Sequence, residues 1–134
     1  KESNIVAMLS PASTIEEAKQ SLEMLKQKDT ANHAGVEIRT TVGVHPYHVN
    51  DEGSLGSSPT SHCNEIKNLI HDNTEYVAAI GECGLDASDG FPPLADQIPW
   101  FEAQVQVAQE LKLPLFVHER LAFDDTIRIL DSVQ

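Results

Sequence analysis

The sequence has few basic residues and few cysteines, and it lacks a long hydrophobic run. Lys and Arg number 9 against 21 Asp and Glu, which gives a net charge of −12. This balance excludes a nucleic-acid binder that relies on a broad basic face, and it disfavours binding to an anionic membrane surface. The two cysteines are too few for a disulfide scaffold. No stretch of about 18 apolar residues is present, so no transmembrane helix is predicted. If such a chain handles phosphates, a cation in the site must supply most of the positive charge.

The chain nevertheless has the composition of a folded protein. Its 134 residues allow one domain at most, and 40% apolar with 22% charged residues argues against disorder. The sequence opens at Lys1 without an initiator Met and ends within a helical pattern at Gln134. We therefore expect residues 1–134 to be a partial domain of a longer protein. We expect that protein to be cytoplasmic, with the nucleus as an alternative.

Four short apolar segments alternate with four helical patterns along the chain. Three of the segments are apolar without alternation, which favours parallel strands buried on both faces. The predicted strands lie near residues 5–9, 38–44, 76–81 and 114–118, and the predicted helices cover residues 13–28, 61–72, 95–112 and 121–132. Units of this length are typical of a (β/α)₈ barrel. The sequence therefore predicts an α/β fold that covers about four βα units of a TIM barrel.

Smaller features refine this prediction. Ser13 and Glu16 have the spacing of a capping box at the start of the first helix. Residues 50–61 and 87–93 are rich in Gly, Ser, Pro and Asp, so we expect loops there. In the last helix, four apolar residues are expected to face inward: Ala122, Phe123, Ile127 and Leu130.

Polar side chains follow three of the predicted strands. His45 follows the second strand, Glu82 and Asp86 follow the third, and His118 and Arg120 follow the fourth. Because the carboxyl ends of parallel strands share one rim, we expect His45, Glu82 and His118 to converge there. Two imidazoles and a carboxylate are suitable ligands for Zn, Mn or Mg ions. They are also compatible with metal-free acid–base catalysis.

Three other histidines and the rim cysteine are expected to have no role in the site. His33, His62 and His71 lie in polar stretches or near a helix start, so we expect them to be exposed. Cys83 lies at the rim, but no thiolate-activating pattern surrounds it. We therefore expect it to be a small buried thiol.

Three segments at these strand ends resemble one known family. TVGVHP at residues 41–46, AIGECGLD at 79–86 and PLFVHER at 114–120 are similar to the TatD family of metal-dependent deoxyribonucleases. The resemblance covers essentially the whole chain, and the GECGLD block is its specific part. It implies a TIM barrel of the amidohydrolase type, of which this chain matches strands two to five. It also implies hydrolysis of DNA phosphodiester bonds with one or two divalent metal ions, which are Mg, Mn or Zn.

The resemblance also implies a role for each rim residue. Glu82 is similar to the carboxylate that bridges or shares the metals, and His118 is similar to a ligand of one metal. His45 is similar to a histidine near the substrate phosphate, so Glu82 and His45 are the implied catalytic residues. Asp86 and Arg120 correspond to groups that support the metal ligands or face the phosphate.

The sequence departs from the family pattern in three ways. It contains no His-x-His pair, which the family carries on its first strand, and it ends before the strands that supply a further His and a metal-binding Asp. Ala87 stands where the family often has an aromatic residue. We therefore expect the remainder of the barrel to come from the same longer chain or from another copy, and residues 1–134 alone to be inactive.

Two alternatives keep the fold and change the function. One is an amidohydrolase-type hydrolase that cleaves amide or ester bonds, because a fold does not fix a function. The other is an inactive half-barrel that serves as a binding or assembly module, because several family ligands are missing from this chain. The expected partner of the leading hypothesis is a DNA substrate, and no membrane partner is expected.

Overall fold

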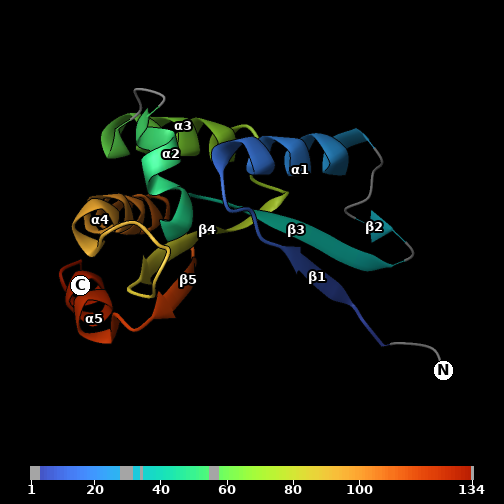
Figure 1. Cartoon of the computed structure of the whole chain (residues 1–134). Coiled ribbons are helices and arrows are strands. Elements are labelled where there is room, and N and C mark those ends of the chain that lie inside the picture. The colour runs from blue at the N-terminus through green and yellow to red at the C-terminus, as the bar shows by residue number, and fades with distance from the viewer. Residues whose placement is uncertain (1–3, 28–31, 34, 55–57, 134) are drawn as a thin grey trace.

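The structure is a computed structural model that describes residues 4–27, 32–33, 35–54 and 58–133. Strands and helices alternate along the chain, as the sequence predicts (Figure 1). In order, the elements are β1 (Ala7–Ser10), α1 (Ile15–Gln27), β2 (Asn32–His33), β3 (Val36–Val42), the 3₁₀ helix η1 (Pro46–His48), α2 (Val49–Ser54), α3 (Pro59–His71), β4 (Val77–Asp86), α4 (Leu94–Leu111), β5 (Leu115–Arg120) and α5 (Phe123–Asp131). Among the described residues, no helix is both long enough and apolar enough to cross a membrane.

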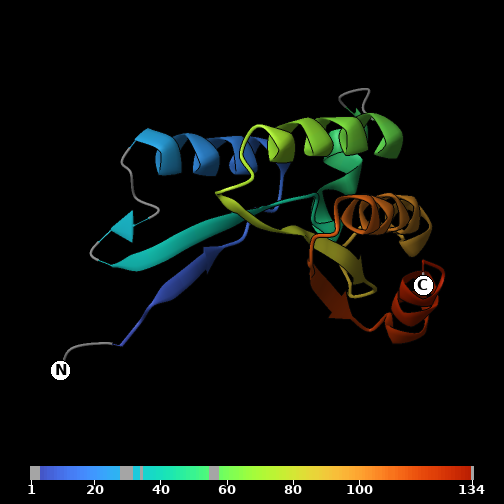
Figure 2. The same ribbon diagram turned by 180° about the vertical axis from the view of Figure 1, so that it is seen from behind.

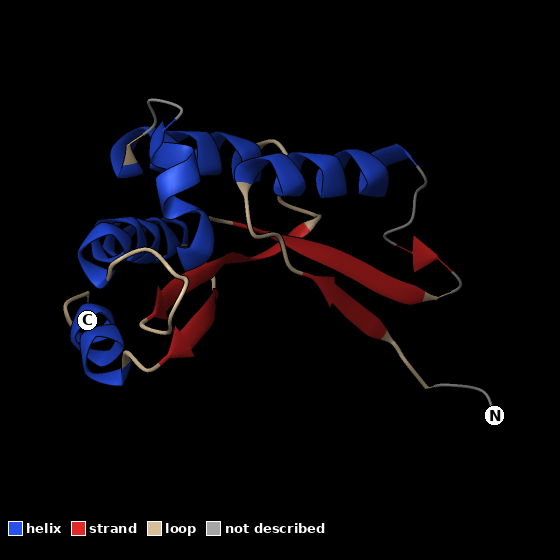
Figure 3. Ribbon diagram, in the orientation of Figure 1, coloured by secondary structure: helices blue, strands red, loops and turns tan. Residues whose placement is uncertain are grey.

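Four parallel strands form the sheet in the order β1-β3-β4-β5 (Figure 3). This arrangement confirms the predicted α/β fold and corresponds to half of a barrel. The sheet also contains β2, which pairs antiparallel with β3. β2 is not among the predicted strands, because a strand of two residues is too short to show a hydrophobic period.

The helices cover one side of the sheet (Figures 1 and 2). α1 and α3 lie above β3 and β4, while α4 and α5 lie beside β4 and β5. Two buried clusters fill the space between the layers. The larger joins α1 and α3 to the sheet and includes Ile15, Leu22, Val42, Ile66 and Ile80. The smaller lies under α4 and α5 and includes Cys83, Leu85, Phe101 and Ile129.

β4 is longer than the sequence predicts. It continues past Gly81 to Asp86, so Glu82 lies inside the strand rather than after it. Glu82 is the extra residue of a β-bulge, because Gly81 pairs with Phe116 and Cys83 with Val117. Gly84 has a φ of +144°, and a Cβ atom there would overlap the backbone of His118. Because Gly81 and Gly84 have no side chain, β4 and β5 can approach each other closely.

The first helix begins one residue later than the predicted cap implies. Thr14 Oγ1 accepts a hydrogen bond from the Glu17 N–H at 3.1 Å, and the Glu17 carboxylate accepts one from the Ser13 N–H at 2.8 Å. The predicted pair of Ser13 and Glu16 is therefore wrong. Burial of Ile15 against the sheet sets the phase of the helix, and this phase places Thr14 at the cap.

The predicted loop over residues 50–61 is also wrong. The chain forms η1 and α2 up to Ser54 and enters α3 at Pro59, whereas residues 55–57 lie outside the described residues. Pro59 occupies the first turn of α3, and Ser58 and Ser61 form a capping box there. Turn-forming residues here begin a helix instead of a loop. The segment Ala87–Pro93, by contrast, contains no helix or strand, as predicted.

Three side chains are placed differently from the prediction. His62 is buried rather than exposed, because α3 packs against α4 and brings the His62 ring to 4.9 Å from the Trp100 ring. Phe123 and Ile127 are exposed rather than inward. The buried face of α5 instead contains Thr126 and Ile129.

Three other side chains lie where the sequence predicts. His71 is exposed, and Ala122 and Cys83 are buried, as predicted. The side chain of His33 lies outside the described residues.

Candidate metal centre

Two residues of the candidate site, His45 and Glu82, are positioned by backbone hydrogen bonds with the loop that precedes α1. The His45 N–H donates a hydrogen bond to the Ser13 carbonyl at 2.9 Å, just after β3 ends. The Glu82 N–H in the β4 bulge donates one to the Ala12 carbonyl at 2.8 Å. The loop between β1 and α1 therefore fixes the backbone of the two segments that carry His45 and Glu82.

The structure brings His45, Glu82 and His118 together, although they lie far apart in the sequence. One ligand atom from each lies within 4.8 Å of the other two. His45 Nε2 is 3.3 Å from His118 Nδ1 and 3.8 Å from Glu82 Oε1, and His118 Nδ1 is 3.4 Å from the same carboxylate oxygen. Two nitrogens and one carboxylate oxygen thus face a common point, which is a donor set that suits a divalent transition-metal ion.

Asp86 fixes the orientation of the His118 ring. Its carboxylate accepts a hydrogen bond from His118 Nε2 at 2.6 Å, so the Nδ1 lone pair points toward Glu82. A carboxylate behind a histidine is the usual support for a metal-bound imidazole. Burial alone would raise the pKa of Asp86, but hydrogen bonds from the Ser88 hydroxyl and N–H and from His118 outweigh it and lower the pKa below its ordinary value. Asp86 therefore stays ionised.

His45 has a different hydrogen-bond pattern from His118. Its Nδ1 accepts a hydrogen bond from the Tyr47 N–H at 3.1 Å, so a neutral ring carries its proton on Nε2. Burial lowers the pKa of His45, and the neighbouring His118 lowers it further. The ring is therefore neutral near pH 7 and points an N–H into the site. The network assigns His45 as a hydrogen-bond donor, whereas His118 and Glu82 present lone pairs.

Two buried glutamines of α4 hold the backbone next to the site. The Gln104 side chain accepts a hydrogen bond from the Val44 N–H at 2.7 Å and donates one to the Val44 carbonyl at 3.1 Å. The Gln97 side chain likewise accepts a hydrogen bond from the Asp86 N–H and donates one to the Asp86 carbonyl, both at 2.8 Å. Each amide therefore completes the backbone hydrogen bonding at a strand end.

The roles of these glutamines and of Ser88 are absent from the sequence prediction. Gln97 and Gln104 are seven residues apart on the buried face of α4, where the other buried residues are apolar, and this spacing was the available signal. Ser88 hydrogen-bonds the Asp86 carboxylate through both its N–H and its hydroxyl. A serine two residues after an aspartate is too common in turns to have identified this contact.

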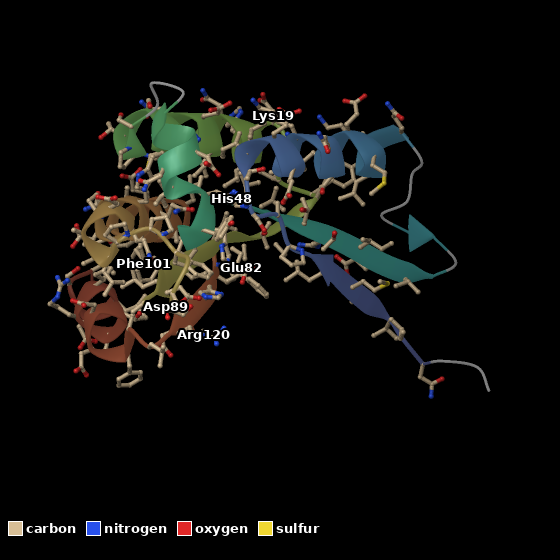
Figure 4. The ribbon with its side chains drawn as sticks, in the orientation of Figure 1. Lys19, His48, Glu82, Asp89, Phe101 and Arg120 are labelled. Carbon is tan, nitrogen blue, oxygen red and sulfur yellow. The ribbon has the colours of Figure 1, made fainter. Side chains whose placement is uncertain are left out.

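Two other rim residues lie outside the three-residue cluster. Figure 4 shows Glu82 near the middle of the molecule and Arg120 at the end of β5, where the Arg120 side chain is exposed. Burial raises the pKa of the Cys83 thiol to about 12, so this cysteine is protonated and packs in the smaller buried cluster. It is the small buried thiol that the sequence predicts.

The fold and the cluster define a class: a parallel α/β half-barrel with a candidate metal centre at its strand ends. Comparison with known families is consistent with this class. The family model described as "TatD related DNase" matches residues 1–134, and the chain belongs to this family.

Curated relatives agree with this assignment, and a solved structure shares the fold. The "3′-5′ ssDNA/RNA exonuclease TatD" of Erwinia amylovora is 35% identical over 130 residues, which cover 97% of this chain and 45% of the relative. A protein of Buchnera aphidicola described as a metal-dependent hydrolase is 40% identical over 92 residues, which cover 67% of this chain and 33% of the relative. The crystal structure of a TatD family hydrolase from Entamoeba histolytica has the same fold, with a TM-score of 0.79 at 24% identity over 96% of this chain and 41% of that one. The chain thus spans less than half the length of these relatives.

Proposed function

We propose that this chain carries part of the active site of a metal-dependent nuclease that hydrolyses phosphodiester bonds in DNA. Membership of the TatD related DNase family supports this proposal, as does the relative described as an ssDNA/RNA exonuclease. The single observation that supports this proposal most strongly is the arrangement of carboxylates around the His118 ring. Asp86 holds Nε2 of this ring, and Nδ1 faces the Glu82 carboxylate at 3.4 Å.

The donor set fits a divalent cation. Imidazole nitrogen and carboxylate oxygen together suit Zn, Mn and, with added water, Mg. A cation would also supply the positive charge that a chain with a net charge of −12 otherwise lacks near a phosphate. When bound, such an ion supplies an activated water and neutralises charge on the phosphate.

The residues of this chain then have distinct tasks. Glu82 and His118 hold the metal, and Asp86 keeps the His118 ring in the correct tautomer. His45 donates from Nε2 to a phosphate oxygen, because its Nδ1 is already occupied by the Tyr47 N–H. Arg120 at the end of β5 has the charge and exposure to contact the phosphate from outside the cluster.

The chain supplies an incomplete site and an incomplete barrel, so we propose that residues 1–134 are part of a larger domain. Residues near β1 support this view, because Val6 and Met8 are 75% and 53% exposed. A closed barrel would cover such side chains. The remaining ligands then come from the same longer chain or from a second copy, and we propose a cytoplasmic location, with the nucleus as the alternative.

A substrate comparison tests the proposed activity. The complete protein is incubated with single-stranded DNA, single-stranded RNA and a cyclic amide, each with Mg²⁺ or Mn²⁺ and again with EDTA. We expect metal-dependent cleavage of DNA that EDTA abolishes, and loss of at least 99% of the rate in Glu82→Ala with the fold unchanged. Cleavage of the amide alone would identify the other hydrolase function, and absence of all three activities would identify a binding module.

A further inference from the structure

Two aromatic side chains lie beside the candidate metal centre and have no role in the mechanism above. The rings of Tyr47 and Phe91 meet at 5.3 Å with an angle of 82°. The Phe91 ring is 6.0 Å from the His45 ring and 6.1 Å from the His118 ring, nearly parallel to the latter at 21°. We call Tyr47 and Phe91 the aromatic pair. Tyr47 lies in η1 and Phe91 in the loop after β4, and they meet at the histidines of the site.

Both segments are held by the residues that orient the site. The Tyr47 N–H is the donor that fixes the His45 ring, so the position of Tyr47 is coupled to His45. Phe91 closes a turn in which its N–H donates to the Ser88 carbonyl at 3.3 Å, and Ser88 in turn hydrogen-bonds Asp86. Gly90 permits this turn with a φ of +89°. The aromatic pair is therefore placed by the same contacts that place the two histidines.

The exposure of the aromatic pair argues against a role in packing. Tyr47 is 51% exposed and Phe91 is partly exposed, and neither belongs to the two buried clusters. Aromatic residues make up only 5% of the chain, so two of them on one rim is a strong concentration. Ala87 leaves the position after Asp86 without a ring, and Phe91 supplies one four residues later.

We infer that the aromatic pair is a stacking platform for an unpaired nucleobase next to the phosphate at the metal centre. This inference rests on the proposed nuclease function and deepens it. A net charge of −12 gives little general attraction for a nucleic-acid backbone, so affinity must come from the cation and from contacts to the base. Stacking on an aromatic ring accepts every base, because each base has a π-face.

The same geometry predicts a preference for single over double strands. A base in a duplex is already stacked and paired, so it must be withdrawn before it can lie on Tyr47 or Phe91. An unpaired base at a strand end has no such cost. The aromatic pair therefore selects single-stranded substrates without reading their sequence.

The test measures binding of a phosphorothioate oligothymidylate, which resists hydrolysis, and of an abasic oligonucleotide with the same backbone. In the presence of Mg²⁺, each oligonucleotide is titrated into the complete wild-type protein. The same titrations are made with the variants Tyr47→Leu, Phe91→Leu and Phe123→Leu. Phe123 is a matched control, because it is 64% exposed and lies on α5, away from the aromatic pair. Proton NMR of the thymine methyl group reports ring contact in the wild-type protein directly.

We expect the wild-type protein and Phe123→Leu to bind the thymidylate about tenfold more tightly than the abasic oligonucleotide. Tyr47→Leu and Phe91→Leu should reduce that difference, and the thymine methyl signal should move upfield in the wild-type complex. Equal binding of the two oligonucleotides by the wild-type protein, without an upfield shift, would overturn the stacking inference and leave the nuclease proposal intact. Binding of neither oligonucleotide would refute the proposed function, and the inference would be lost with it.

Discussion

Gln104 offers a direct test of how helix α4 supports the site. Its buried amide satisfies both backbone groups of Val44, the residue before His45, and it also donates to the Trp100 carbonyl at 3.1 Å. Gln104→Leu keeps much of the side-chain volume but leaves the Val44 N–H and carbonyl without their partners. A leucine cannot replace these hydrogen bonds, and water has no access to a side chain that is only 2% exposed.

The size of the destabilisation follows from the Val44 N–H and carbonyl, which lose their hydrogen-bond partner. Leaving a buried backbone donor or acceptor unsatisfied costs roughly 1–3 kcal/mol each, and a volume-conserving swap adds little. We expect Gln104→Leu to lower the free energy of unfolding by about 2–6 kcal/mol. The Val44 amide should also lose its protection from hydrogen exchange, while amides in α1 keep theirs under native conditions.

Urea denaturation and amide hydrogen exchange measure these effects. Gln106→Leu is the matched control, because Gln106 lies on the exposed face of the same helix. We expect the control to change stability by less than about 0.5 kcal/mol. A Gln104→Leu variant as stable as the control, with the Val44 amide still protected, would refute the assigned role of Gln104.

Three further predictions concern the strand contact, the acid response and the completeness of the chain. Gly84→Ala should destabilise the fold by about 3–5 kcal/mol, because its Cβ would overlap the His118 backbone at a strained φ. Thermal unfolding measures this effect, and a loss of stability below about 1 kcal/mol would contradict it. Metal-free protein should lose stability as pH falls below 6.5, because unfolded His45 gains a proton before the folded ring does. A second loss of stability should follow as pH falls below 3.8 and through the lowered pKa of folded Asp86, because the unfolded carboxylate gains a proton first. Urea midpoints measured against pH for wild type and His45→Gln check both steps. Residues 1–134 expressed alone should show no nuclease activity with Mn²⁺, and a chain that cleaves DNA by itself would contradict the proposed partial domain.

The strand–helix order could be predicted from the sequence because each unit buries a distinct apolar segment. The run from Tyr76 to Ile80 and the pattern of α1 indicate their own structure without tertiary information. The end of β4 could not be found in this way, because the role of Gly84 depends on the approach of β5, a contact between distant residues. The same limit explains His62, whose polar neighbours in sequence gave no sign that α3 packs against α4.

The convergence of the site followed from one rule, whereas its electrostatics did not. Parallel strands place their carboxyl ends on one rim, and this was sufficient to group His45, Glu82 and His118. The tautomers depend on the Tyr47 N–H and on Asp86, which are contacts set by loop conformation. No spacing in the sequence distinguishes a histidine that donates a hydrogen bond from one that offers a lone pair.

The central claim is that Glu82 and His118 Nδ1 form a metal centre in which His45 is a donor and not a ligand. The most direct test is a Zn²⁺ titration of the complete protein, monitored by nitrogen NMR of the imidazole rings. The exposed His71 is the internal control. We predict a large shift of His118 Nδ1 that Glu82→Gln weakens at least tenfold, while His45 keeps the proton on Nε2 and His71 is unchanged. Coordination of Zn²⁺ by His45 Nε2, or no shift at His118, would contradict the claim.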